Sequence, residues 1–118
     1  MPYVDAADVE ESRVAPPFER VLKMVMEDQE FTLIYSELAP RGGGTDFHVH
    51  ESSGELMVFI GGTGKAWLAG EEHQISPGDA MYAPRGVEHK TLNTGTEPLK
   101  IVCVFVPPVS ADYIRNAK

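Results

Sequence analysis

The sequence predicts an all-β domain of the barrel or sandwich type. Short runs of alternating apolar and polar residues recur at close spacing, and clusters rich in glycine and proline separate them. No long stretch shows the apolar period of an amphipathic helix, so we expect strands to supply the core. With 118 residues, the chain has the length of one domain with a single core.

Composition and charge argue against several classes of function. The chain is 42% apolar and 24% charged, which is ordinary for a globular protein and does not indicate disorder. The net charge of −8, with scattered basic residues, argues against a nucleic-acid partner. No apolar stretch approaches the ~20 residues of a membrane-spanning helix, and the opening residues lack the pattern of a secretory signal. The single cysteine, Cys103, excludes an internal disulfide, and we expect a cytoplasmic protein.

We divide the chain into an extended N-terminal arm (1–18), a β-barrel domain (19–108) and a C-terminal tail (109–118). The arm is acidic and ends in Pro16 and Pro17, and proline keeps the preceding residue extended. The tail begins after two more prolines that end the last strand. Ser110 is expected to cap a short C-terminal helical turn.

Nine segments have the alternation and composition of β-strands, and glycine or proline interrupts the chain between most of them. The segments 65–69 and 71–75 flank Gly70 and predict a hairpin. The nine expected strands are 19–27, 31–38, 45–50, 55–60, 65–69, 71–75, 80–83, 88–93 and 99–106.

Four side chains with metal-ligand atoms are expected on the inner faces of these strands. His48 and His50 are two residues apart, so in a strand both imidazoles point to one side. Glu55 follows after a short turn, and His89 lies in a later strand. Imidazole nitrogens with one carboxylate oxygen suit one divalent transition metal: Fe, Mn, Ni, Zn or Cu. A single histidine would more simply be a surface or hydrogen-bonded residue, but four inward polar groups need a compensating partner.

Two stretches of the sequence match the two motifs of the cupin family, with every spacing kept. The motif residues are Gly42, His48, His50, Glu55 and Gly62 in the first stretch, and Gly78, Pro84, Gly86, His89 and Asn93 in the second. The chain therefore resembles a small single-domain cupin over residues 42–93. This resemblance implies a jelly-roll barrel, or double-stranded β-helix, with one metal site. It also implies a homodimer.

Sequence features add to the expectation of a homodimer. Leu56, Val58 and Ile60 fall on the face of their strand that points away from the expected metal site. The extended N-terminal arm could also cross to a partner and cover an exposed sheet edge.

Two residues are candidates for acid–base work beside the metal. Asp46 has the parity of His48 and His50, although a carboxylate at the start of a strand can also serve a turn. Tyr35 is expected on the inner face of the strand 31–38. The substrate pocket is expected to be lined by the mostly apolar set Met57, Phe59, Cys103 and Phe105. For Cys103, a role as a small buried apolar residue is the simpler interpretation.

The ligand set supports three kinds of function. Four protein ligands leave two positions on an octahedral ion, so a small anionic or chelating substrate and dioxygen could bind together. We therefore rank a dioxygenase-type oxidoreductase first. A metal-dependent isomerase or lyase, in which the metal is a Lewis acid, is the second alternative. A non-catalytic small-molecule-binding domain is the third.

Overall fold

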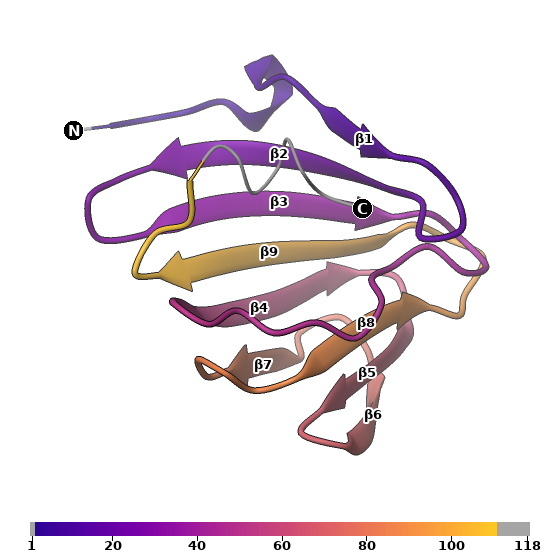
Figure 1. Cartoon of the computed structure of the whole chain (residues 1–118). Coiled ribbons are helices and arrows are strands. Elements are labelled where there is room, and N and C mark those ends of the chain that lie inside the picture. The colour runs from indigo at the N-terminus through magenta and orange to yellow at the C-terminus, as the bar shows by residue number, and fades with distance from the viewer. Residues whose placement is uncertain (1, 111–118) are drawn as a thin grey trace.

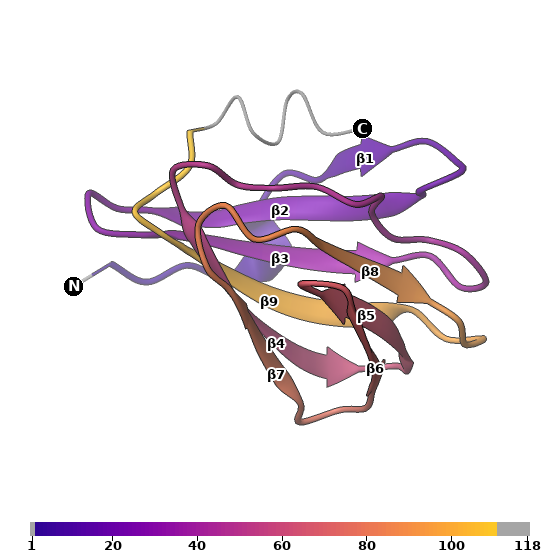
Figure 2. The same ribbon diagram turned by 60° about the horizontal axis from the view of Figure 1, so that its bottom comes forward.

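In the computed structural model, which describes residues 2–110, nine strands form two antiparallel sheets (Figure 1). The larger sheet has the strand order β1-β2-β3-β9-β4-β7, and the smaller one has the order β6-β5-β8. Figure 2 shows the smaller sheet folded over one face of the larger sheet, so the predicted all-β jelly-roll barrel is confirmed. The strands are β1 (Ser12–Val14), β2 (Arg20–Glu27), β3 (Thr32–Leu38), β4 (Gly54–Gly61), β5 (Gly64–Leu68), β6 (Glu71–Ile75), β7 (Ala80–Ala83), β8 (His89–Asn93) and β9 (Leu99–Val106).

The core lies between the two sheets and follows the alternation of the strands. Ile34 of β3 is paired with Cys103 of β9, which is paired in turn with Met57 of β4. All three side chains are buried, as are Ala66 of β5 and Ile75 of β6 in the smaller sheet. Burial of this apolar surface, at about 25 cal/mol per Å², is the main force that holds the two sheets together.

The structure corrects the prediction of a strand at 45–50. This segment forms only isolated bridges, Gly44 to Leu92 and His48 to His89, in place of a continuous ladder. The physical reason lies at Asp46, whose carboxylate accepts the backbone N–H of Phe47 at 2.8 Å. A local side-chain bond of this kind competes with the sheet for the amide. The segment nevertheless runs beside β8.

The N-terminal residues fold onto their own chain. The expected extended arm contains β1, which pairs with β2 from Ser12 opposite Leu22 to Val14 opposite Arg20. Strand β1 therefore covers the edge of β2 within one molecule, which is how sheets commonly protect an edge. The residues of β1 thus pair within the chain, and crossing of the arm to a partner sheet stays a prediction.

Helical structure is confined, within residues 2–110, to the short 3₁₀ helix η1 (Ala6–Asp8). Asp5 caps it by accepting the N–H of Ala7 at 3.0 Å. No helix in this part of the chain has the length and apolarity to cross a bilayer. The expected C-terminal helical turn falls on residues 111–118, which lie outside the described residues.

Asn93, at the end of β8, ties three backbone segments together inside the barrel. Its side chain is fully buried. The amide nitrogen donates to the carbonyls of Leu38 at 2.9 Å and Glu97 at 2.8 Å, and its oxygen accepts the N–H of Gly95 at 2.9 Å. Nearby, Gly62 has a φ of +80°, and a Cβ there would collide with the carbonyl oxygen of Pro98. These contacts fix the β8–β9 connection against β3.

Candidate metal centre

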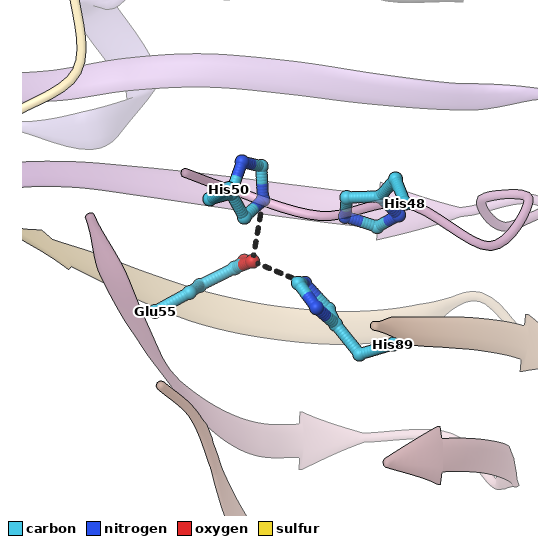
Figure 3. Close-up of side chains that lie close together, drawn as sticks. All are labelled: His48, His50, Glu55 and His89. Carbon is cyan, nitrogen blue, oxygen red and sulfur yellow. Dashed lines mark hydrogen bonds and ion pairs between the residues drawn. The ribbon is translucent and has the colours of Figure 1, made fainter. Parts of the chain in front are cut away.

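The four predicted ligands meet at one point inside the barrel. One ligand atom from each of His48, His50, Glu55 and His89, hereafter the ligand cluster, lies within 4.8 Å of the others. Figure 3 shows the carboxylate of Glu55 between the rings of His50 and His89. Its Oε1 is 3.1 Å from Nε2 of His50 and 3.0 Å from Nε2 of His89. Segments far apart in the sequence thus converge on a single site.

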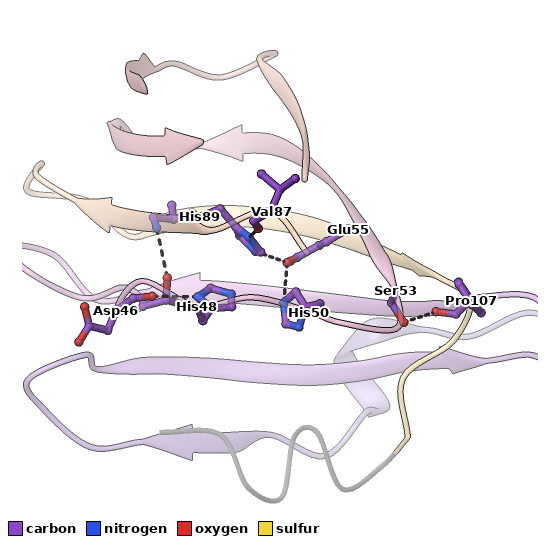
Figure 4. Close-up of polar contacts among 10 residues, drawn as sticks. Asp46, His48, His50, Ser53, Glu55, Val87, His89 and Pro107 are labelled. Atoms are coloured by element: carbon purple, nitrogen blue, oxygen red, sulfur yellow. Dashed lines mark hydrogen bonds and ion pairs between the residues drawn. The ribbon is translucent and has the colours of Figure 1, made fainter. Parts of the chain in front are cut away.

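Backbone bonds hold the segments that carry these side chains. The N–H of His48 donates to the carbonyl of His89, and the N–H of His89 donates back, each at 3.0 Å. The turn before Glu55 is anchored by Ser53, whose hydroxyl donates to the carbonyl of Pro107 at 2.7 Å (Figure 4). The ligand positions are therefore set by the sheet rather than by the side chains alone.

A group of aromatic rings holds the ligand segment from its outer side. The ammonium of Lys90, next to His89, lies 5.3 Å from the ring centre of Phe47. It lies 5.6 Å from the ring centres of both Phe18 and Trp67. Cation–π attraction of this kind contributes about 0.5–1 kcal/mol at exposed sites. Lys90 thus connects β8 to the residue immediately before His48.

Backbone carbonyls select the tautomers of two histidines. Nδ1 of His48 lies 2.8 Å from the carbonyl oxygen of Asp46, and Nδ1 of His89 lies 3.0 Å from that of Val87 (Figure 4). A carbonyl can only accept, so Nδ1 carries the proton in both rings. Nε2 is then the atom of each ring that faces the ligand cluster. Orientation of this kind is typical of metal-binding histidines.

The electrostatics of the ligand cluster favour the protonation states that a metal needs at Glu55 and His48, but favour a proton on His89 that a metal must displace. Burial raises the pKa of Glu55, but hydrogen bonds from His50 and His89 outweigh burial and lower the pKa to about 2. Burial lowers the pKa of His48 to about 4 against the opposing bond to the carbonyl of Asp46, so its ring is neutral at neutral pH. Burial lowers the pKa of His89, yet the bond to Glu55 leaves it raised overall.

These residues fit a divalent transition metal. Three imidazoles and one ionised carboxylate form a mixed nitrogen and oxygen donor set that suits first-row metals. Without a metal, the proton on Nε2 of His89 that is hydrogen-bonded to Glu55 balances the charge of the buried carboxylate. A bound metal cation would take over that role. The ligand cluster can therefore hold a metal, as the sequence predicted, and its donor set alone does not select among Fe, Mn, Ni, Zn and Cu.

Metal affinity is expected to fall as the pH is lowered. Because the pKa of His89 is raised, acid keeps a proton on a nitrogen that the metal must take. Between pH 7 and pH 5.5 we expect at least about a tenfold loss of affinity for Zn²⁺, with little of it from His48, which stays neutral to about pH 4. Competition titrations with a chromogenic chelator measure this directly. An affinity independent of pH over this range would contradict the interpretation.

A cavity of about 40 Å³ lies beside the ligand cluster, and the structure distributes the predicted pocket residues unevenly around it. Met57, Cys103 and Phe105 line this cavity, whereas Phe59 lines a second one toward β6 and β7. Burial raises the pKa of the Cys103 thiol well above its ordinary value, with the charge of Glu55 adding to the effect, so the thiol stays protonated.

The structure corrects the prediction for Tyr35, because it places this side chain on the outer face of the sheet and not on the inner face. Strand β3 buries Thr32, Ile34, Ser36 and Leu38, so the face that includes Tyr35 points away from the cavity. The sequence misled because both faces of β3 carry apolar residues. Burial raises the pKa of Tyr35, and the neighbouring Glu37 raises it further.

Asp46 shares the chain segment of the histidines but not their direction. Its side chain is exposed, and Figure 4 shows the carboxylate pointing away from the ligand cluster. Its backbone carbonyl, rather than its carboxylate, contacts His48.

Sequence reasoning missed Arg20, which is buried and lines the cavity with His48, Glu55 and His89. The signal was present in the alternation of β2, where Arg20 has the same parity as Leu22. Three hydroxyl residues of the lining, Ser36, Thr45 and Thr91, were likewise not assigned to the pocket.

Comparison with known proteins identifies relatives by sequence. An uncharacterized protein of Methanocaldococcus jannaschii, MJ1618, is 37% identical over 73 residues, which cover 62% of this chain and 58% of that protein. Quercetin 2,3-dioxygenase of Bacillus subtilis is 30% identical over 89 residues, covering 75% and 26%. L-ectoine synthase of Bordetella petrii is 31% identical over 78 residues, covering 64% and 57%. The chain thus spans less than two thirds of each of these relatives.

The fold has a close counterpart among solved structures. KdgF from Halomonas sp. superposes with a TM-score of 0.82 at 23% identity, over 95% of this chain and 97% of that one. A family model described as "Cupin domain" matches residues 34–105, more than half of the chain and the part that carries the ligand cluster. This protein therefore belongs to the cupin family.

Proposed function

We propose that this cupin is a metal-dependent enzyme that acts on a small anionic or chelating substrate, with an oxidative reaction of the dioxygenase type. The observation that carries the proposal is the position of the ligand cluster at the wall of a small, mostly apolar cavity. Quercetin 2,3-dioxygenase, which matches three quarters of the chain, supports the oxidative reaction.

The chain's own residues prepare the site in two ways. The bonds from His48 and His89 to backbone carbonyls aim their Nε2 atoms at one point. The apolar walls formed by Met57 and Phe105 exclude water, which strengthens the electrostatic attraction between the site and a bound anion. A redox-active divalent ion, when bound, would supply the chemistry that lets a chelating substrate react with dioxygen.

Asp46 remains a candidate for proton transfer only if its side chain turns toward the cavity, whereas Tyr35 lies on the far face of an inner strand of the sheet. Neither residue lines the cavity, since Asp46 is exposed and Tyr35 lies on the outer face of β3. Turnover that is unchanged in both Asp46→Asn and Tyr35→Phe would remove these residues from the mechanism.

A non-oxidative reaction at the same site is the second candidate. The similarity to L-ectoine synthase favours this non-oxidative reaction, because the relatives of the chain include a synthase as well as a dioxygenase. In that reaction the metal acts as a Lewis acid, as expected for an isomerase or lyase. Binding of a small molecule without turnover is the third candidate.

Oxygen dependence separates these candidates. A screen of small chelating acids with the Fe²⁺-loaded protein, followed by an oxygen electrode, is expected to find a substrate whose turnover consumes dioxygen. Exchange of Fe²⁺ for Zn²⁺ should lower that turnover at least about a hundredfold, since zinc has no redox chemistry. The Glu55→Gln variant is the matched control for consumption of dioxygen that does not depend on the metal. Turnover at the aerobic rate without dioxygen would replace the oxidative reaction with the second candidate.

We also propose a homodimer that forms through the outer face of the larger sheet. Leu56, Ile60, Tyr82 and Val106 are all exposed there, and Leu56 is paired with Tyr82 on the neighbouring strand. Exposed apolar groups that adjoin in this way favour a protein partner. Light scattering should give twice the chain mass, and Leu56→Glu with Ile60→Glu should give the mass of one chain. Tyr3→Glu, at an exposed site outside the sheet, is the control, and a monomeric wild type would contradict the proposal.

A further inference from the structure

The cavity beside the ligand cluster continues along the inner face of the larger sheet, and the strand register gives its depth. Glu55 of β4 is paired with Phe105 of β9, and both line the cavity next to the ligand cluster. Two residues further along each strand, about 7 Å away, the lining consists of Met57, Cys103 and Ile34. A group bound at the ligand cluster can therefore extend into the cavity along these three side chains.

Leu22 of β2 and Ile101 of β9, hereafter the deep wall, line the cavity further from the ligand cluster. Both residues are paired, from either side, with Ser36 of β3. They are 4% and 3% exposed, so the core is closely packed around them. With a volume of about 40 Å³, the cavity holds roughly three water-sized groups. A longer chain that starts at the ligand cluster would collide with the deep wall.

The polar groups along the cavity have hydrogen-bond partners within the chain. The hydroxyl of Thr45 accepts the N–H of Thr91 at 3.1 Å, and Nη1 of Arg20 donates to two backbone carbonyls. Ser36 is hydrogen-bonded to the thiol of Cys103. No buried side-chain nitrogen or oxygen of residues 2–110 is without a hydrogen-bond partner. A polar ligand group in the cavity would lose its hydration and gain little in return, so the cavity favours an apolar group.

We propose that the substrate carries an apolar tail of about three carbons on its metal-binding group, and that the deep wall sets the length of this tail. The substrate class is then a short-chain aliphatic acid. Its chelating end lies at the ligand cluster, and its tail lies along Met57, Cys103 and Ile34. Leu22 and Ile101 are the residues that determine specificity for length. This inference rests on the proposed function for the chelating end and adds the nature and length of the remainder.

A homologous series of alkyl hydroxamates tests the proposal by calorimetric titration of the Zn²⁺-loaded protein. The aceto-, propano-, butano-, pentano-, hexano- and octanohydroxamates present the same chelating group to the metal, so differences in affinity report the tail. From acetohydroxamate to butanohydroxamate, we expect the affinity to rise about fourfold per carbon, the gain for burying one CH₂ group. Hexanohydroxamate should bind at least about tenfold more weakly than butanohydroxamate, because the surplus carbons overpack the cavity.

Variants of the deep wall show whether it sets the length limit. Ile101→Ala enlarges the cavity, so it should make hexanohydroxamate the tightest binder while the metal content stays unchanged. Val102→Ala is the matched control, because Val102 is the next residue of β9 and the strand alternation directs it to the outer face. Its best ligand should remain butanohydroxamate.

A milder variant keeps the test decisive if Ile101→Ala does not fold. Ile101→Val removes less of the side chain and should fold. It should raise the affinity for pentanohydroxamate relative to butanohydroxamate at least about twofold over the wild-type ratio. An unchanged ratio in Ile101→Val would then count against the deep wall as the length limit.

Three results would overturn the proposal. Wild type could bind acetohydroxamate at least as tightly as every longer tail, its affinity could keep rising to octanohydroxamate, or butanohydroxamate could remain the best ligand of folded Ile101→Ala. Failure of every hydroxamate to bind the fully loaded protein would contradict the chelating substrate of the proposed function, and the tail with it. Oxygen consumption is measured separately. A protein that shows the length preference but consumes no dioxygen would contradict the oxidative reaction and leave the tail standing.

Discussion

Replacement of both His50 and His89 by alanine is expected to lower the metal content from about one equivalent to under about 0.1 after dialysis. The double variant keeps only His48 and Glu55 of the ligand cluster, too few to hold a divalent transition metal tightly. It also removes the hydrogen bonds that Glu55 accepts from His50 and His89 inside the barrel. An uncompensated buried carboxylate is unfavourable, so the variant should also melt at a lower temperature.

Elemental analysis by plasma mass spectrometry measures the metal content. His73→Ala is the matched control, because His73 is the histidine of the sequence outside the ligand cluster and lies exposed on β6 beside Glu71. It should retain the full equivalent. A double variant that also retained a full equivalent would show that the ligand assignment is wrong.

Replacement of Asn93 by alanine is expected to lower the free energy of unfolding by about 3 kcal/mol. The substitution removes three hydrogen bonds, to Leu38, Glu97 and Gly95, at a site without exposure to water. Each buried backbone group left without its partner carries a desolvation cost of about 1–3 kcal/mol, which structural relaxation lowers in part.

Urea denaturation of the metal-free protein gives the free energy of unfolding for this comparison. Thr94→Ala, at the exposed neighbouring residue, should change it by less than about 0.5 kcal/mol. If Asn93→Ala were as stable as this control, the buried amide would not be what fixes the β8–β9 connection.

The ligand cluster was predictable because its residues obey local rules. The spacing of His48 and His50, and their match to a motif with fixed positions, do not depend on how the rest of the chain folds. The regular strand expected around them did not form, because Asp46 takes the amide of Phe47. The two imidazoles still reach one site, since the segment is held by paired bonds to β8.

Which face of a strand is buried was harder to predict than the presence of the strand. Alternation separates the residues of β3 into two faces, but only the packing of the second sheet decides which face is buried. The outer face carries Leu33 and Tyr35, and the inner face carries Ser36, so composition favoured the wrong side. Arg20 escaped notice for a related reason, because a charged residue at a strand end is ordinarily exposed.

The most direct test of the metal centre is anomalous diffraction from crystals of protein purified from its native host. Data collected at the absorption edges of Mn, Fe, Ni, Cu and Zn would locate a bound metal and identify it. The structure predicts one anomalous peak, bounded by Nε2 of His48, His50 and His89 and by the carboxylate of Glu55. A peak elsewhere, or no peak in protein that elemental analysis shows to contain a full equivalent of metal, would contradict a metal centre at the ligand cluster.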